Sequence, residues 1–196
     1  MSIEHAATRL FAANGYAATS VDDIVTAAGV TKPMLYRHFE SKRELCIRLL
    51  ERYREELISA PLSQFPADEA DSSAGGDRPR GPDRKELAGM IDAWLAWVEE
   101  HPDACRLLFT PVRGDDEVER VQRELHVRQR ATQAALIREF MPGLSEADAE
   151  PLAEITRAGF AAIALWRLDH PDRARADARQ ALLRMAQGVL SSEADD

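Results

Sequence analysis

The sequence predicts an all-α protein, with a three-helix domain at the N-terminus and a larger helical bundle after it. Apolar residues recur with the helical period of about 3.6 residues through almost every ordered stretch. No stretch alternates apolar and polar residues with a period of two, as a half-buried strand would. Apolar residues make up 45% of the chain and charged residues 30%, as in ordinary globular domains.

The first helix is predicted to run from Ile3 to the Asn14-Gly15 pair. Ile3, Ala7 and Phe11 fall on one helical face. Gly15 is a suitable C-cap because glycine adopts the left-handed conformation at little cost.

Two short helices and the start of a long one follow. Ser20 predicts the beginning of the second helix, because its hydroxyl can cap free backbone amides. Gly29 ends that helix, and Thr31 caps a third that runs to about Phe39. Ser41 then caps a fourth, long helix.

The rest of the chain predicts five further helices after one interruption. Residues 61–82 combine four prolines with three glycines and no apolar period, which is typical of a flexible loop or linker. Helical patterns cover about 87–98, 102–109, 116–140, 145–168 and a last segment that ends at 190. We therefore divide the chain into a helix-turn-helix domain (1–48), a connecting helix (49–60), the loop (61–82), a helical domain (83–190) and a disordered tail (191–196).

Residues 19–45 have the pattern of a helix-turn-helix. The turn is Ala28-Gly29-Val30, where glycine permits the bend between two short helices. The predicted buried contacts of the pair are apolar: Val21, Ile24, Val25, Leu35 and Phe39. The outer face of the second helix mixes cations, a hydroxyl and ring donors with apolar groups, which suits a DNA major groove.

The charge distribution favours DNA contact by this segment alone. The whole chain has a net charge of −9, which by itself argues against nucleic acid. Residues 1–54, however, hold eight Lys or Arg and six Asp or Glu, a balance of +2, so that the remainder carries −11. A slightly basic head on an acidic body fits a protein whose head alone meets phosphate.

This segment resembles the DNA-binding domain of the TetR family. The matching positions are Ile3, Ala7, Phe11, Gly15, Tyr16, Thr19, Ser20, Ala28, Gly29, Val30, Leu35, Tyr36, His38, Phe39, Ser41 and Lys42. The resemblance covers about residues 3–50, and the remainder is similar only in its length and helical order. The family usually has several residues before the first isoleucine, often basic. Here either the true start lies upstream of Met1, or binding depends more on residues 31–42.

The resemblance implies specific DNA contacts. Thr19 or Ser20 would offer a hydroxyl and a helix N-terminus to phosphate. Thr31, Tyr36 and His38 would hold the DNA backbone, and Lys42 would add a salt-dependent phosphate contact. Lys32, Pro33, Met34 and Arg37 would lie nearest the base edges. Tyr36 and His38 could instead pack inside, and Lys42 could be an ordinary solvated charge.

The resemblance also implies that the second domain binds a small ligand and forms a homodimer through its last two long helices. The small residues of 158–165 and the apolar face of 181–189 support an isologous four-helix interface, although they could pack within one subunit. Candidate pocket residues are Trp94, Trp97, Phe109, His126, Gln129, Thr132 and Trp166. The alternative for the tryptophans is ordinary core packing.

Other functional classes have little support in the sequence. Cys46 and Cys105 have no zinc spacing and are expected to be buried thiols rather than a redox switch, and we expect no cofactor or metal. No paired-carboxylate site, nucleophile elbow or phosphate-binding glycine loop indicates an enzyme. No apolar run reaches the roughly 18 residues of a membrane span, and no secretory signal is visible, so we expect a cytoplasmic protein.

The sequence therefore predicts a ligand-responsive regulator, most simply a repressor. It would bind a palindromic operator on double-stranded DNA as a dimer and be released by an unidentified small molecule. The alternative is a DNA-binding regulator or architectural protein without a small-molecule effector, controlled by a partner protein.

Overall fold

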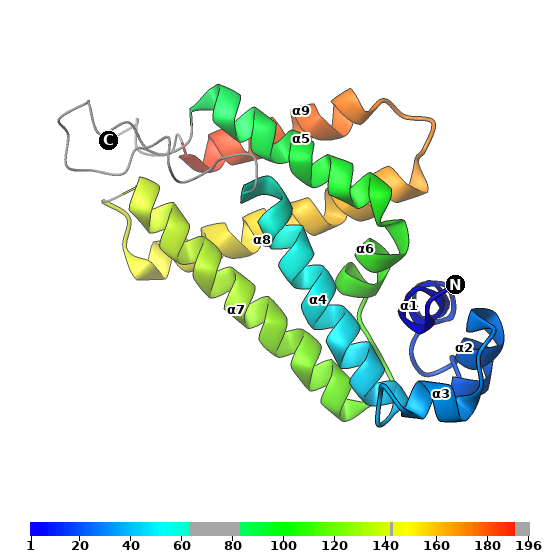
Figure 1. The fold of residues 1–196 in the computed structure, drawn as a ribbon. Helices are drawn as coiled ribbons and strands as arrows, with labels where there is room; N and C mark the ends of the chain where they lie inside the picture. Colours follow the sequence, from blue (N-terminus) through cyan, green and yellow to red (C-terminus); the bar gives the residue numbers. More distant parts are fainter. Residues whose placement is uncertain (63–82, 142, 191–196) are drawn as a thin grey trace, which may run out of the picture. The chain divides into compact units, whose positions relative to one another are not determined.

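The computed structural model describes residues 1–62, 83–141 and 143–190, and within these ranges the chain is helical and has no strand. The helices are α1 (Ile3–Asn14), α2 (Val21–Ala28), α3 (Lys32–Tyr36), α4 (Lys42–Leu62), α5 (Arg84–Glu100), α6 (Pro102–Phe109), α7 (Asp116–Phe140), α8 (Glu146–Asp169) and α9 (Arg175–Leu190) (Figure 1). The predicted all-α fold, a helix-turn-helix followed by a helical domain, is confirmed. The predicted loop lies outside the described residues from 63 onward, as does the predicted tail.

The N-terminal helices begin and end at the residues that favour these ends. Ser20 and Asp23 form a capping box at the start of α2, in which each side chain accepts a hydrogen bond from the other residue's backbone amide. Gly15 and Gly29 follow α1 and α2 with φ of 80° and 70°, a region that glycine enters easily. Ser41 accepts a hydrogen bond from the Glu44 amide over 3.1 Å and so caps α4.

α3 is shorter than the sequence predicts. It ends at Tyr36 rather than near Phe39, and the amides of His38 and Phe39 both donate to the carbonyl oxygen of Leu35 over 3.0 Å. This tight turn buries the ring of Phe39, which is 6% exposed, and leads directly to the cap of α4. The helical period continues through Phe39, so the sequence does not show where the helix ends.

The chain forms two compact units. Unit 1 comprises residues 1–56 and 101–126, and unit 2 comprises residues 57–100 and 127–196. α4 and α7 each contribute residues to both units. α6 and the first part of α7 group with the N-terminal helices, because α1 packs against α6 as well as against α2.

Unit 1 has a core of apolar side chains from all its helices. The fully buried members include Ile24, Leu35, Leu45, Leu49 and Val118. One buried polar side chain, Gln122, accepts from the Val112 amide over 2.9 Å and donates to the Thr110 carbonyl over 3.1 Å. Its amide therefore satisfies backbone groups of the connection between α6 and α7, which are costly to bury unpaired.

Unit 2 is organised around α5, α8 and α9. The rings of Trp94 and Phe160 meet edge to face, with their centroids 4.9 Å apart, and Leu182 is fully buried. A Cβ added to Gly159 would lie 2.3 Å from Sδ of Met185, so glycine permits close approach of α8 and α9. None of the helices in the described ranges is long and apolar enough to cross a membrane.

Candidate nucleic-acid interface

The short helix α3 divides its side chains between the core of unit 1 and the solvent. Leu35 is fully buried, whereas Met34 and Tyr36 are 43% and 49% exposed although both are large and mostly apolar. The exposed side chains around this helix, here called the α3 face, are Thr31, Lys32, Pro33, Met34, Tyr36, Arg37 and His38. All seven were candidate DNA contacts in the sequence, and the structure brings them together at the surface. Tyr36 and His38 do not pack inside.

The bend before α3 has a defined geometry. Gly29 adopts φ 70° and ψ 32°, and its amide donates to the carbonyl oxygen of Thr26 over 3.2 Å. The next amide, of Val30, donates to the carbonyl oxygen of Val25 over 3.0 Å. These bonds close the end of α2, so that the α3 face is presented on a fixed turn rather than on a free loop.

The two hydroxyls before α2 face opposite ways. Thr19 is 1% exposed, and its hydroxyl lies 2.8 Å from the carbonyl oxygen of Gly15. Ser20 is exposed, and its hydroxyl lies 2.6 Å from a carboxylate oxygen of Asp23. Of the two candidate phosphate contacts, the structure therefore places Ser20 at the surface and Thr19 in the interior.

Lys42 is held by the protein itself. Its ammonium donates to the carbonyl oxygens of Tyr16 and Thr19 over 2.9 and 2.8 Å, and lies 4.1 Å from the centre of the Tyr16 ring. A lysine ammonium has three N–H donors, so one remains for a phosphate oxygen. The carbonyl contacts give Lys42 a structural role that the sequence does not reveal, because its partners lie 26 and 23 residues away.

The charges near the α3 face are mixed. The ammonium of Lys32 lies 2.9 Å from Asp22 on α2, with both side chains exposed. Hydrogen bonding to Asp22 raises the pKa of Lys32, and hydrogen bonds from Ser20 lower the pKa of Asp23, so these groups are charged at neutral pH. An exposed pair of this kind contributes little to stability. Lys32 can therefore exchange Asp22 for a phosphate at small cost.

The seven candidate ligand residues are divided between the two units. Phe109 and His126 belong to unit 1, and Trp94, Trp97, Gln129, Thr132 and Trp166 belong to unit 2. Trp94 and Trp97 are each 6% exposed within the core, and Trp166 stacks on His170 with ring centroids 5.0 Å apart. Thr132 is exposed and donates its hydroxyl to the Arg128 carbonyl over 3.0 Å.

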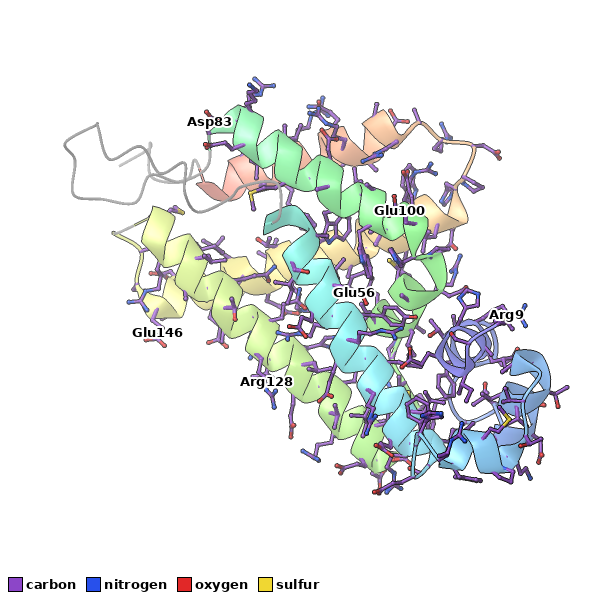
Figure 2. All side chains as sticks on the ribbon, viewed as in Figure 1. Arg9, Glu56, Asp83, Glu100, Arg128 and Glu146 are labelled. Atoms are coloured by element: carbon purple, nitrogen blue, oxygen red, sulfur yellow. The ribbon has the colours of Figure 1, made fainter. Side chains whose placement is uncertain are left out.

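Unit 2 also carries a groove that the sequence does not indicate. It has a volume of about 300 Å³ and lies between α7 and the start of α8, where Glu146 is labelled in Figure 2. The lining residues are Val127, Arg130, Ala131, Ala134, Ala135, Arg138, Glu146 and Glu150. None of the seven candidate ligand residues is among them.

Both cysteines are buried, as the sequence predicts. Cys46 and Cys105 are free thiols with no exposed surface, and burial raises the pKa of each to about 12. Such thiols are poorly reactive because the nucleophilic form is the thiolate. In the described parts of the chain, no three His, Cys, Asp or Glu side chains are grouped so that they could hold a metal ion.

Asp115 has a role in unit 1 that the sequence does not indicate. Asp115, in the turn before α7, accepts hydrogen bonds from the guanidinium of Arg43 over 2.9 Å and from the hydroxyl of Tyr16 over 3.2 Å. These partners are 72 and 99 residues away, so no local pattern indicates the contact.

The segment that carries the α3 face matches a known protein family. Residues 3–49 match the family model described as "Bacterial regulatory proteins, tetR family". These residues contain α1, α2 and α3, the α3 face, Ser20 and Lys42.

Two curated relatives carry regulatory names. The chain is 32% identical over 104 residues to the HTH-type transcriptional activator FasR of Mycolicibacterium smegmatis, an alignment that covers 53% of this chain and 42% of the relative. It is 30% identical over 108 residues to the HTH-type transcriptional repressor SCO4008 of Streptomyces coelicolor, with 55% and 46% covered. The chain thus spans less than half the length of these relatives.

A solved structure extends the likeness of fold to nearly the whole chain. A TetR-like transcriptional regulator from Rhodococcus sp. RHA1 superposes with a TM-score of 0.72 at 21% sequence identity, covering 97% of this chain and 94% of the other. At this identity the comparison concerns the fold.

Proposed function

We propose that the chain is a ligand-responsive transcriptional regulator of the tetR family, whose family model matches residues 3–49. The proposed protein binds a palindromic operator as a homodimer, represses transcription there and is released by a small molecule. The family is one of regulators rather than enzymes. Because the target is chromosomal DNA, the proposed location is the cytoplasm.

The α3 face is the observation that carries the proposal. A five-residue helix that buries Leu35 yet leaves Met34 and Tyr36 about half exposed has an outward surface that its own fold does not use. Groups of this kind on the second helix of a helix-turn-helix are suited to the major groove.

We assign the contacts by position around this helix. Lys32, Pro33, Met34 and Arg37 would lie nearest the base edges, and Thr31, Tyr36 and His38 would hold the backbone on either side. Thr31 makes no capping hydrogen bond with its hydroxyl, so that donor can reach a phosphate. Ser20 and the third N–H of Lys42 would add contacts at the ends of α2 and α4.

The proposed dimer uses an exposed stripe of small and apolar side chains on α8. Ile155 is 56% exposed, and Ala158 and Ala162 follow it on the same helical face. On α9, Ala181 and Gly188 are exposed, and a Cβ added to Gly188 would meet nothing within 4 Å. Two such faces could meet in an isologous four-helix contact.

Three other residues of 158–165 are less available for that contact. Phe160 packs on Trp94, Gly159 faces Met185 and Ala164 is fully buried, all within the same chain. The dimer proposal therefore concerns the outer stripe alone.

The proposed effector site is in unit 2, and its candidates there are Trp94, Trp97, Gln129, Thr132 and Trp166. Nearby in the sequence, the buried side-chain oxygen of Gln133 has no hydrogen-bond partner in the described parts of the chain. An unpaired buried acceptor is costly, and a donor on a ligand would satisfy it. Phe109 and His126 belong to unit 1 and are not part of this proposed site.

Packing of Trp94 against Phe160 favours the alternative, a regulator or architectural protein that is controlled by a partner and has no small-molecule effector. A thermal-shift screen against small metabolites separates the two. A ligand that raises the melting temperature and weakens operator binding supports the effector. A ligand that raises the melting temperature without weakening operator binding does not support the effector.

The test of DNA recognition is selection of bound fragments from the source genome by the purified full chain. We expect enrichment of an inverted repeat that is lost from the selected pool when Tyr36 is replaced by alanine. An intact dimer that enriches no sequence would overturn the proposal. The neighbouring genes would also indicate whether binding represses or activates.

A further inference from the structure

The turn between α6 and α7 is tied to the DNA-binding helices by one carboxylate. Oδ2 of Asp115 accepts from Nε of Arg43, on α4, over 2.9 Å and from the hydroxyl of Tyr16 over 3.2 Å. Oδ1 accepts from the amides of Glu117 and Val118 over 3.1 and 3.3 Å, which caps α7. The same side chain therefore starts α7 and holds the N-terminal helices.

Close to this carboxylate, the turn between α6 and α7 packs against the turn between α1 and α2. Gly114 has φ 93°, and a Cβ on it would lie 2.6 Å from Cβ of Ala17. Both the left-handed conformation and the available space therefore require glycine. The turn before α7 is in van der Waals contact with the turn between α1 and α2.

Lys42 also holds the turn between α1 and α2. Its ammonium binds the carbonyl oxygens of Tyr16 and Thr19, at the two ends of residues 16–19, and lies over the Tyr16 ring. Ser20, the N-cap of α2, comes directly after this segment. A shift of residues 16–19 would move the N-terminus of α2 with it.

Side chains of α7 hold the turn before α7 by hydrogen bonds to its backbone. Gln122 bonds the backbone of Thr110 and Val112, and the carboxylate of Glu119 accepts from the Gly114 amide over 3.1 Å. Both Gln122 and Glu119 lie on α7. The turn is thus held by the first residues of α7, and the two are expected to move together.

The joint keeps one protonation state around neutral pH. Burial, together with the neighbouring charge of Asp115 and its hydrogen bond, raises the pKa of Tyr16 to about 12. Burial opposes ionisation of Asp115, yet hydrogen bonds from Arg43, the Val118 amide and Tyr16 outweigh it and hold the pKa below its usual value. Tyr16 therefore donates and Asp115 accepts.

We propose that Tyr16, Lys42, Arg43, Gly114 and Asp115 form a joint that positions the DNA-contacting N-terminus of α2 relative to the start of α7. Asp115 and Arg43 are then positioning residues for operator binding, and a displacement of the start of α7 changes operator affinity. This inference rests on the proposed function, because it assigns a consequence to the DNA contacts of α2 and α3.

Charge alone predicts the opposite effect of removing Asp115. Loss of a carboxylate near the head reduces repulsion of DNA and frees Arg43 for phosphate, so binding would tighten. If the joint positions the head, Asp115→Asn weakens binding in spite of the gain in positive charge. The sign of the change therefore separates the two explanations.

The first experiment is operator titration with the full chain and with Asp115→Asn. The matched control is Glu117→Gln, which removes the same charge two residues away, from a side chain that pairs with Arg120 on its own helix. We expect about tenfold weaker binding for Asp115→Asn at an unchanged salt slope, and unchanged or slightly tighter binding for the control. Equal or tighter binding by Asp115→Asn would overturn the joint.

Arg43→Gln completes a double-mutant cycle. If Arg43 acts through Asp115, it weakens binding without lowering the salt slope, and the double variant binds no more weakly than Asp115→Asn alone. Additive losses, with a smaller salt slope for Arg43→Gln, would show that Arg43 contacts phosphate directly and is not a positioning residue.

The second experiment is hydrogen exchange on the DNA-free protein, which separates failure of the joint from failure of DNA binding. We expect the amides of residues 15–20 to exchange faster in Asp115→Asn than in the wild type or Glu117→Gln, with α8 and α9 unchanged. If the wild type binds no operator, the proposed function fails and this exchange result alone decides whether the joint exists. Unchanged exchange at residues 15–20 would refute it.

Discussion

Leu35 and Tyr36 are adjacent in α3, yet the first is fully buried and the second is 49% exposed. Replacing Tyr36 by alanine removes a side chain that the fold does not enclose. We expect operator affinity to fall about tenfold, while the free energy of unfolding changes by less than about 0.5 kcal/mol. Titration of the operator and chemical denaturation measure the two quantities.

Leu35→Ala is the control for that substitution, since it opens a cavity in the core of unit 1. It is expected to cost about 2–5 kcal/mol of stability. If Tyr36→Ala destabilised the protein as much as it weakened DNA binding, Tyr36 would be a packing residue and not a contact.

Lys42 differs from an ordinary surface cation because it binds two carbonyl oxygens. From the sequence alone, its replacement would be expected to affect DNA binding and spare the fold. From the structure, Lys42→Ala should also lower the free energy of unfolding by about 2 kcal/mol, as loss of charge-assisted hydrogen bonds does. Denaturation of Lys42→Ala and Lys32→Ala tests this, because Lys32 has only an exposed ion pair and its loss should cost less than about 0.5 kcal/mol.

Tyr16 provides a test by pH. Its pKa is raised to about 12 in the folded state, chiefly by burial, whereas an unfolded tyrosine has a pKa near 10. The folded state therefore holds this proton more tightly, and the resulting stability is complete below about pH 10 and is lost as the pH rises toward 12. Absorbance titration should show a late phenol that is absent in Tyr16→Phe. An unchanged titration in that variant would contradict the assignment.

At the scale of elements, the sequence predicts helix ends better than it predicts contacts between helices. Ser20, Gly29 and Ser41 mark ends correctly because capping depends on neighbouring backbone groups. The early end of α3 depends on burial of Phe39, and the pairing of Asp115 with Arg43 depends on chain folding over 72 residues. No pattern in the neighbouring sequence indicates either feature.

Substitutions of Gly29 and Gly114 distinguish the cost of backbone strain from the cost of a steric clash. Gly29 and Gly114 both have positive φ, but an added Cβ meets nothing within 4 Å at Gly29 and lies 2.6 Å from Ala17 at Gly114. Gly29→Ala should therefore cost about 1–2 kcal/mol from strain alone. Gly114→Ala should cost about 2–4 kcal/mol because a clash is added. Equal losses of unfolding free energy in the two variants would show that Gly114 is not packed against Ala17.

At the scale of the whole molecule, the sequence identifies an all-α chain with a basic head but does not reveal how it divides into units. The predicted domain boundary follows the order of the helices, whereas the compact units each combine two separate segments. α6 joins the N-terminal helices through contacts with α1, which sequence periodicity does not show. The candidate DNA contacts could be named because they lie within one short motif. The pocket candidates are spread over 73 positions, from Trp94 to Trp166, and the structure does not gather them in one unit.

The proposed dimer predicts a mass near twice the 21.8 kDa of one chain. Ala162→Glu places a charge in the exposed stripe of α8 and should yield a monomer that binds the operator weakly, because one head makes too few contacts. Ala135→Glu makes the same change at an exposed position on α7 and serves as the control. Light scattering after gel filtration measures both. A dimeric Ala162→Glu would exclude this face as the interface.

Specific recognition of DNA by the α3 face is the central claim, and the specificity ratio tests it most directly. The measurement is the Kd of the wild type for the selected operator and for a scrambled duplex of equal length, at one physiological salt concentration. We predict operator binding at least about 10³-fold tighter, and a much smaller ratio for Arg37→Ala. A wild-type ratio near one would contradict the claim, since the protein would then bind DNA through charge alone.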